Sequence, residues 1–301
     1  MRKLLFFVVI LFISNRIYSQ KKENTLLWKI TKPNSLNVSY LFGTFHQVNP
    51  DFFDSLKNAK KLLLESNLLF VEAYQEKENT NTENEITSIY GVWNKEKWDS
   101  ISTPTQQRLY NKFVNSKWGD EEMYRLPPAL LMLTLQDIYL QGVCDTSNRI
   151  SVEKMDNRII SIAKKNKIKI EGLDENQFMD IQKSTKKDKF FSLKNTIKTN
   201  ADYMNYILHG NTNTSSAKFL FNYKSLSLDY SFNKEEQNLK VLLTGRNDKW
   251  MKKLPQALDT KNCFIAVGIR HLFYKDGLIM QLKKQGYSVQ PVQLEMDRSQ
   301  Q

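Results

Sequence analysis

The sequence predicts an α/β fold in which helices flank a central sheet. One observation is that short apolar runs alternate with stretches whose apolar residues recur every three or four positions. A second is that each end of the chain contains a strand, then Gly-x-x-His, then a helix, around Gly43–His46 and Gly268–His271. A third is that the middle section, residues 104–260, is mostly helical in pattern. With 41% hydrophobic and 25% charged residues, the 301-residue chain is not a disordered protein.

The first segment of the chain has the order of a secretory signal peptide. Two basic residues precede an unbroken apolar run, Leu4–Ile13, and a short polar stretch follows it. In a helix the ten residues of this run would cover about 15 Å, which is half of a hydrocarbon core about 30 Å thick. We therefore expect removal of residues 1–19 and a secreted or periplasmic product, beginning near Gln20, without stable membrane insertion.

The next part of the chain predicts two strands, a helix and a buried strand. The strands are Thr25–Thr31 and Val38–Gly43, joined by a turn with the sequence Lys-Pro-Asn-Ser. A helix is predicted over Asp51–Ser66, where apolar residues recur at helical spacing. Asn67–Ala73 is short and apolar and carries one carboxylate, Glu72, so it is predicted to be a buried strand.

The remaining elements follow without a linker rich in Pro or Gly. Glu76–Glu85 has no apolar residue and is predicted to be a loop, because helical patterning resumes soon after it. We therefore treat residues 20–301 as one domain. Apolar stripes predict helices over Pro128–Leu140, Val152–Lys165, Tyr203–His209 and Lys234–Leu243. A short strand is predicted over Ile168–Gly172, followed by Asp174 as a helix cap. The last elements are predicted to be strand Cys263–Val267, helix Gly277–Lys284 and strand Tyr287–Val292.

The two cysteines, Cys144 and Cys263, are too few for a disulfide framework or a four-thiolate zinc site. In an oxidising compartment they form either one disulfide or two buried free thiols. Because its neighbours are apolar, Cys263 is expected to be buried and not catalytic.

Two of the three histidines lie in the repeated units, and a third candidate group follows a predicted strand. Ligands of open α/β sheets bind beyond the carboxyl ends of the strands, so His46 and His271 should point into that crevice. Glu72 ends a strand of the same sheet, and we expect the three side chains to converge. Two imidazoles and a carboxylate suit a divalent first-row ion such as Mn, Co or Zn, which would acidify a bound water. Alternatively, Glu72 pairs with a Lys or Arg at the sheet edge.

Other function classes lack support. The sequence contains no H-E-x-x-H, G-x-S-x-G, G-x-x-x-x-G-K-S/T, G-x-G-x-x-G or C-x-x-C motif. The net charge of +12 permits binding to anions, but no basic stripe interleaved with aromatic residues accompanies Lys164–Lys169 or Lys183–Lys189. We therefore expect no nucleic-acid partner. His209 precedes Gly210 at a predicted helix end and is expected to satisfy helix carbonyls.

Over most of its mature length the chain resembles the TraB/PrgY/GumN family, which includes the Tiki proteases. The resemblance rests on blocks that follow one another in the family's order. These are Leu41–His46 (LFGTFH), Glu72 in Val71–Ala73, Asp156–Ala163 with Glu171–Gln177, Arg246–Met251 (RNDKWM), and a terminal G-x-x-H-L-x4-G-L-x3-L-x3-G-Y-x-V block over Gly268–Val289.

The resemblance implies a secreted metal-dependent hydrolase with the peptidase-like chemistry of the Tiki members, acting on a peptide or small molecule. In it His46, Glu72 and His271 bind the metal or activate water, and Arg246 and Asn247 support the substrate. Two alternatives are implied by related proteins. The PrgY-like branch, which controls peptide pheromones, implies a non-catalytic binding module, and erythromycin-esterase-like proteins imply a metal-free hydrolase with His46 as general base. The oligomeric state is left open.

Three positions depart from the family pattern. Arg270 stands where many relatives have a small residue, Tyr274 where they often have Gly, and Asp174 where they usually have Glu. We expect Arg270 either to bind an anionic group or to be a surface charge or a partner for Glu72.

Overall fold

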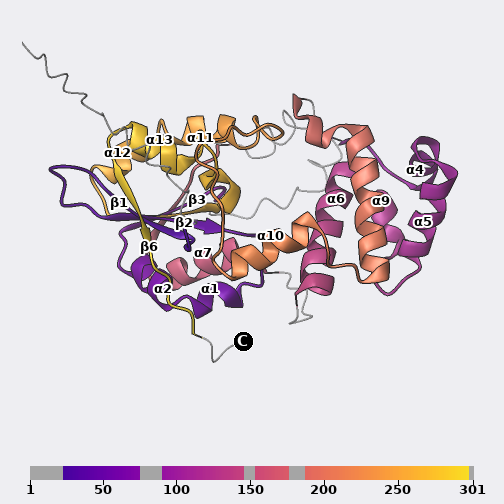
Figure 1. Ribbon diagram of the computed structural model, residues 1–301, viewed down its shortest axis with the longest axis horizontal. Helices are drawn as coiled ribbons and strands as arrows, with labels where there is room; N and C mark the ends of the chain where they lie inside the picture. The colour runs from indigo at the N-terminus through magenta and orange to yellow at the C-terminus, as the bar shows by residue number, and fades with distance from the viewer. Residues whose placement is uncertain (1–22, 75–89, 146–152, 176–186, 298–301) are drawn as a thin grey trace, which may run out of the picture.

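The computed structural model describes residues 23–74, 90–145, 153–175 and 187–297 (Figure 1). The expected signal peptide, residues 1–19, and the expected loop Glu76–Glu85 lie outside the described residues. Within them the chain forms a six-stranded mixed sheet of order β4-β3-β5-β2-β1-β6, with helices beside it. The predicted α/β fold class is confirmed.

The sheet gathers the carboxyl ends of four parallel strands at one edge. β2 and β3 each pair in parallel with β5, and β4 pairs in parallel with β3. β1 pairs antiparallel with β2 and with β6. Residues that follow β2, β3, β4 and β5 therefore meet at the same edge. The strands are β1 Leu27–Thr31, β2 Ser39–Thr44, β3 Leu68–Val71, β4 Lys169–Gly172, β5 Cys263–Gly268 and β6 Ser288–Val292.

Helices cover both faces of the sheet. β3 is buried along its whole length and β5 up to its last residue, as expected for central parallel strands that pack against helices on both sides. One face is covered by α1 Asp51–Ser55, α2 Lys57–Leu64 and α7 Met155–Lys165, and the other by α11 Thr244–Trp250, α12 Leu254–Leu258 and α13 Leu278–Lys284 (Figure 1).

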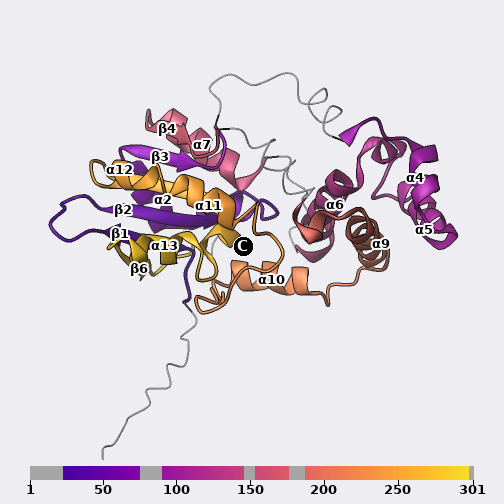
Figure 2. The same cartoon turned by 90° about the horizontal axis from the view of Figure 1, so that it is seen from above.

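A group of helices lies beside this α/β layer, in both views (Figures 1 and 2). Pro104 and Pro128 stand at the first helical positions of α5 and α6, where proline costs no hydrogen bond. In α9, Gly210 ends the helix in the left-handed conformation, and Nδ1 of His209 lies 2.8 Å from the Asn205 carbonyl, as expected for a helix end. The members are α4 Lys95–Ile101, α5 Pro104–Val114, η1 Glu121–Arg125, α6 Pro128–Asp137 continued by the π-helix η2 Ile138–Cys144, η3 Lys189–Phe191 and α9 Leu193–His209, with α10 Ser215–Lys224 leading back to the layer.

The helix predicted over Asp51–Ser66 is divided at Leu56. Leu56 forms an isolated antiparallel bridge with Met296, and the N–H of Lys57 donates to the carbonyl of Glu295. The backbone at this point therefore pairs with the end of the chain instead of continuing one helix, and α1 and α2 are separate.

The prediction of a helix over Lys234–Leu243 is wrong, because this segment forms turns. Side-chain oxygens accept hydrogen bonds from backbone N–H groups that would otherwise donate to carbonyls within a helix. Oε1 of Glu236 accepts the N–H groups of Asn238 and Leu239, and Oδ1 of Asp188 accepts that of Val241. Local side-chain hydrogen bonds of this kind compete with helix formation.

The two cysteines are buried free thiols, so the disulfide alternative is not the one that the structure contains. Cys263 is fully buried in β5, as expected from its apolar neighbours. Among the described residues, no helix combines the length and the apolar character needed to cross a bilayer.

Candidate functional site

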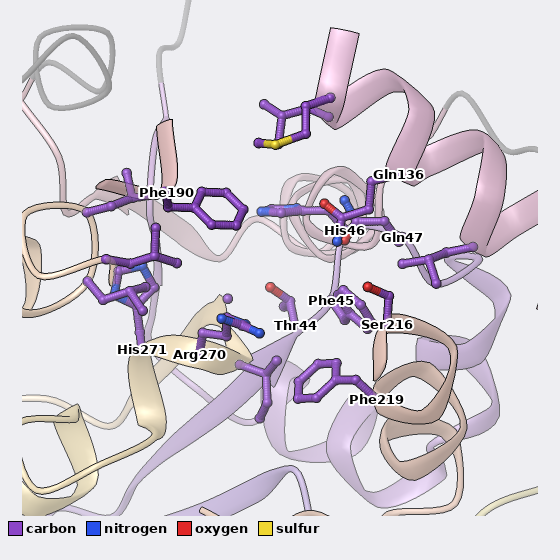
Figure 3. Close-up of a pocket in the computed structure, with 18 of the residues that line it drawn as sticks. Thr44, Phe45, His46, Gln47, Gln136, Phe190, Ser216, Phe219, Arg270 and His271 are labelled. Carbon is purple, nitrogen blue, oxygen red and sulfur yellow. The ribbon is translucent and has the colours of Figure 1, made fainter. Parts of the chain in front are cut away.

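A pocket of about 670 Å³ lies between the carboxyl edge of the parallel strands and the helices beside the sheet (Figure 3). One wall comes from the ends of β2, β3 and β5 and from η4 (Ile269–Leu272), and the other from α6, η3, α9 and α10. This volume is in the range of small-molecule sites. The predicted residues His46, Glu72, Arg246, Arg270 and His271 all line it.

Glu72 follows the last residue of β3 and is buried. Its Oε1 accepts the N–H of Gly268 at 2.7 Å, and its Oε2 accepts Nη2 of Arg246 at 2.5 Å. Burial would raise the pKa of this carboxyl, but the charge of Arg246, together with that of His46 and the Gly268 N–H, outweighs burial and holds the pKa well below its usual range. Glu72 is therefore ionised at neutral pH and is a weak base.

Arg246 joins Glu72 to a second buried carboxylate, that of Asp174. Nη2 and Nε of Arg246 lie 2.5 and 3.2 Å from the two oxygens of Asp174, and Nε1 of Trp250 donates to Asp174 at 2.7 Å. The expected role of Asp174 as a helix cap concerns residues beyond 175, outside the described residues. We call Glu72, Arg246 and Asp174 the buried ion cluster.

His271 lies in η4 with 3% of its surface exposed. Asn247 uses its amide nitrogen for the carbonyls of His271 and Asp276, so its Oδ1 accepts the proton of His271 Nδ1 at 2.8 Å. The other nitrogen, Nε2, then accepts Nη1 of Arg246 at 3.2 Å. Burial, aided by the positive charge of Arg246, lowers the pKa of His271 to about 3. His271 is therefore neutral, and its lone pair is already used.

His46 follows β2 and has a different environment. Its Nδ1 lies 2.7 Å from Oδ2 of Asp156 in the first turn of α7, and Thr44 donates its hydroxyl to Oδ1 of Asp156 at 2.8 Å. The imidazole keeps 47% of its side-chain surface exposed. Attraction to Asp156 exceeds the cost of desolvation and raises the pKa of His46 to about 9. His46 is thus charged at neutral pH, and its Nε2 is the nitrogen available to the pocket.

Arg270 does not pair with Glu72, whose guanidinium partner is Arg246. Its Cζ lies 5.6 Å from the centre of the Phe219 ring, and within the described part of the chain no carboxylate forms an ion pair with it. Tyr274 does not line the pocket, and its φ of 69° lies in the left-handed region that favours glycine. The departures at residues 270 and 274 therefore leave His46, Glu72 and His271 in place.

The three predicted metal ligands share one pocket but do not form a metal-binding cluster as they are placed. Among the described residues, no group of three or more His, Cys, Asp or Glu side chains is arranged to hold a metal ion. Both oxygens of Glu72 are occupied, and Arg246 brings a positive charge to Glu72 and His271 at hydrogen-bond distance. The present arrangement therefore does not fit a metal, and metal binding stays a prediction.

Sequence reasoning missed several residues of the site. Asp156 stood in one of the family-like blocks, but nothing in the sequence showed that it would contact His46. Gln136 and Ser216 come from α6 and α10 and reach into the pocket (Figure 3). Asn247 was expected to support a substrate, yet it is tied to His271 and is not among the residues that line the pocket.

The profile of the TraB/PrgY/gumN family matches residues 26–291, nearly the whole chain. No match was found among curated proteins or among solved structures.

Proposed function

The chain belongs to the TraB/PrgY/gumN family, and we propose that it is a hydrolase that cleaves a peptide-like substrate in the pocket, with His46 as the acid–base group. The observation that supports this most is the His46–Asp156 pair. Asp156 lies 2.7 Å from one imidazole nitrogen and raises the pKa of the ring, and the other nitrogen is left toward the pocket. A carboxylate that orients a histidine in this way is a recurring device of hydrolytic enzymes.

The hydrolysis follows from the chemistry of the free nitrogen. When His46 is neutral, Nε2 accepts a proton from a water molecule, and the water oxygen forms a bond with the carbonyl carbon of the substrate. The imidazolium then donates that proton to the leaving nitrogen, and the carbon–nitrogen bond breaks. Because the pKa of His46 is about 9, the basic form is scarce at neutral pH and the rate should increase as the solution becomes alkaline.

The buried ion cluster and His271 determine the shape and the charge of the wall that the strand ends provide. Glu72 is a weak base because its pKa is held low, and the lone pair of His271 is used by Arg246. We assign these residues to positioning the ends of β3 and β5, which carry the wall opposite the helices. Arg246 contacts the substrate only through the part of its surface that lines the pocket.

A metal-dependent form of the same hydrolysis is the second candidate. It is favoured by the presence of His46, Glu72 and His271 in one pocket, and it would require Arg246 to leave Glu72 and His271. A bound ion would supply an acidified water. Metal content, measured on the purified protein by mass spectrometry, distinguishes the two forms, as does inhibition by a chelator.

The test uses the mature chain, a mixture of synthetic peptides and mass-spectrometric detection of fragments. We expect His46→Asn to lower cleavage by about 10²–10⁴-fold, the usual contribution of a general acid–base group. His209→Asn, at the end of α9, is the matched control and should cleave like the wild type. Equal cleavage by the His46→Asn protein contradicts the proposal. Peptides that bind but are never cleaved would instead support a binding module.

We also propose that the protein is exported, because residues 1–19 have the order of a signal peptide. The mass of the protein purified from its native host should correspond to a chain that begins near Gln20. A mass that includes Met1 would contradict export by this route.

A further inference from the structure

We infer that the pocket binds an apolar chain that ends in a carboxylate, and that Arg270 contacts this carboxylate. The inference rests on the proposed function in one respect, which is that the bound ligand is taken to be the C-terminal end of a peptide. The lack of an ion-pair partner for Arg270 among the described residues, the placement of its guanidinium and the apolar wall each support it.

Among the charged side chains that line the pocket, Arg270 is the one without an oppositely charged partner in the described part of the chain. The charge of His46 faces the carboxylate of Asp156, and Arg246 lies between two carboxylates in the buried ion cluster. His271 is neutral because its pKa is about 3. Arg270 has no carboxylate partner within the described residues. A carboxylate on a ligand would give Arg270 the ion-pair partner that the described residues do not supply.

Arg270 is held where its guanidinium edge stays available. It follows the end of β5 in η4, and its Cζ lies 5.6 Å from the centre of the Phe219 ring. Phe219 is itself fixed by edge contacts with Phe45 and Phe273, at centroid distances of 5.3 and 6.0 Å. A guanidinium that lies over a ring at this distance still has N–H groups free to donate, which suits a carboxylate. In Figure 3 Arg270 extends into the open space that His46 and Phe190 also reach.

The wall provided by the helices is apolar and partly uncovered. Leu133 of α6 and Phe190 of η3 line the pocket and are 41% and 38% exposed, although both are large hydrophobic residues. Exposed apolar side chains that line a concave site indicate a ligand with apolar surface. Other apolar residues of the lining are Met132, Leu140, Phe191, Leu239, Leu242 and Leu243.

Polar side chains also line the pocket, besides Arg270 and the apolar wall, and they suit the backbone of a peptide. Gln136 and Ser216 point into the pocket from α6 and α10 (Figure 3), where they can bond to peptide N–H and C=O groups. Such groups would have no partner on a fatty acid chain. A peptide with apolar side chains and a free C terminus therefore uses all three features of the pocket.

The test compares matched ligands by isothermal titration calorimetry. The probes are N-acetyl-trileucine with a free carboxylate, the same peptide as its C-terminal amide, and decanoate as an acid without peptide groups. Intact recovery of each peptide is checked by mass spectrometry, so that binding is measured separately from cleavage. The proteins are the wild type, Arg270→Gln, Arg270→Lys and the control Arg125→Gln, which removes an exposed arginine of η1.

We expect the wild type and the control to bind the peptide acid about tenfold more tightly than the amide, as one charge-assisted contact provides. Arg270→Gln should lose this preference and Arg270→Lys should keep part of it. Equal binding of acid and amide by the wild type, or an undiminished preference in Arg270→Gln, overturns the inference. Tighter binding of decanoate than of the peptide acid overturns the peptide part. A preference that depends on Arg270 without any cleavage leaves the inference standing and contradicts the hydrolase.

Discussion

Asp156 places Oδ2 at 2.7 Å from Nδ1 of His46, and this contact gives the two histidines of the pocket opposite properties. The pKa of His46 is raised to about 9 by the carboxylate, and that of His271 is lowered to about 3 by burial. The repeated strand–Gly-x-x-His–helix units therefore do not supply equivalent groups. The unit at the start of the chain provides the group that can exchange a proton, and the unit at the end provides a neutral group fixed by Asn247 and Arg246.

Arg246 is expected to contribute most to the stability of the carboxyl edge of the sheet. Arg246→Met leaves Glu72 and Asp174 buried without their counter-charge, which should lower the free energy of unfolding by about 3–5 kcal/mol. Denaturant titration measures the change. Arg125→Met, which removes an exposed arginine, is the control and should change the free energy by less than about 0.5 kcal/mol. A loss for Arg246→Met no larger than that of the control contradicts the role of the cluster.

The pKa of His271 predicts a loss of stability in acid. Its pKa is about 3 in the folded chain against an ordinary value of 6.5, so between these pH values the unfolded chain binds a proton that the folded chain does not. As pH falls from 6.5 towards 3, His271 should therefore reduce the free energy of unfolding, by at most about 1.4 kcal/mol per pH unit.

The comparison variant for this effect is His271→Asn, since asparagine does not titrate and can still donate to Asn247. The wild type should lose its stability advantage over His271→Asn as the pH falls through the window. Thermal unfolding measured at several pH values reports the difference. A difference that stays constant between pH 6.5 and 4 would mean that His271 titrates normally.

The order of elements could be predicted from the sequence, because apolar periodicity and the Gly-x-x-His units depend on local pattern. The absence of a helix over Lys234–Leu243 could not be predicted from local pattern. The apolar spacing of this segment is helical, but the side chains of Glu236 and of the distant Asp188 take its backbone donors. The break at Leu56 likewise depends on a pairing with the end of the chain. The prediction of one domain over residues 20–301 stays a prediction.

The residues of the site could be predicted better than their partners. Strand ends and the parallel sheet bring His46, Glu72 and His271 to one pocket, and the sequence shows both features. The partner of Glu72 was expected only as some Lys or Arg, because the sequence does not show that α11 brings Arg246 to the end of β3. The contact between His46 and Asp156 joins residues 110 positions apart and depends on the tertiary fold.

The cysteines are expected to be inert in the folded protein. Cys263 is fully buried, and burial raises the pKa of its thiol to about 11, so it should carry no nucleophilic thiolate at neutral pH. Native protein should react slowly with a thiol reagent, and protein unfolded without reductant should release two thiols, the number in the chain. Cys263→Ser should remain active. Release of no thiols on unfolding would reveal a disulfide and contradict the structure.

The measurement that tests the account most directly is the pH dependence of kcat/KM for a cleaved peptide in the wild type and in Asp156→Asn. In the wild type the rate should rise with pH up to about 9, where His46 loses its proton. In Asp156→Asn the carboxylate that raises this pKa is absent, so the rise should move towards about 6.5, the ordinary value for histidine. Asp99→Asn, which alters an exposed carboxylate of α4, should keep the wild-type profile. Profiles of the wild type and Asp156→Asn that rise at the same pH would contradict the assignment of His46 as the acid–base group.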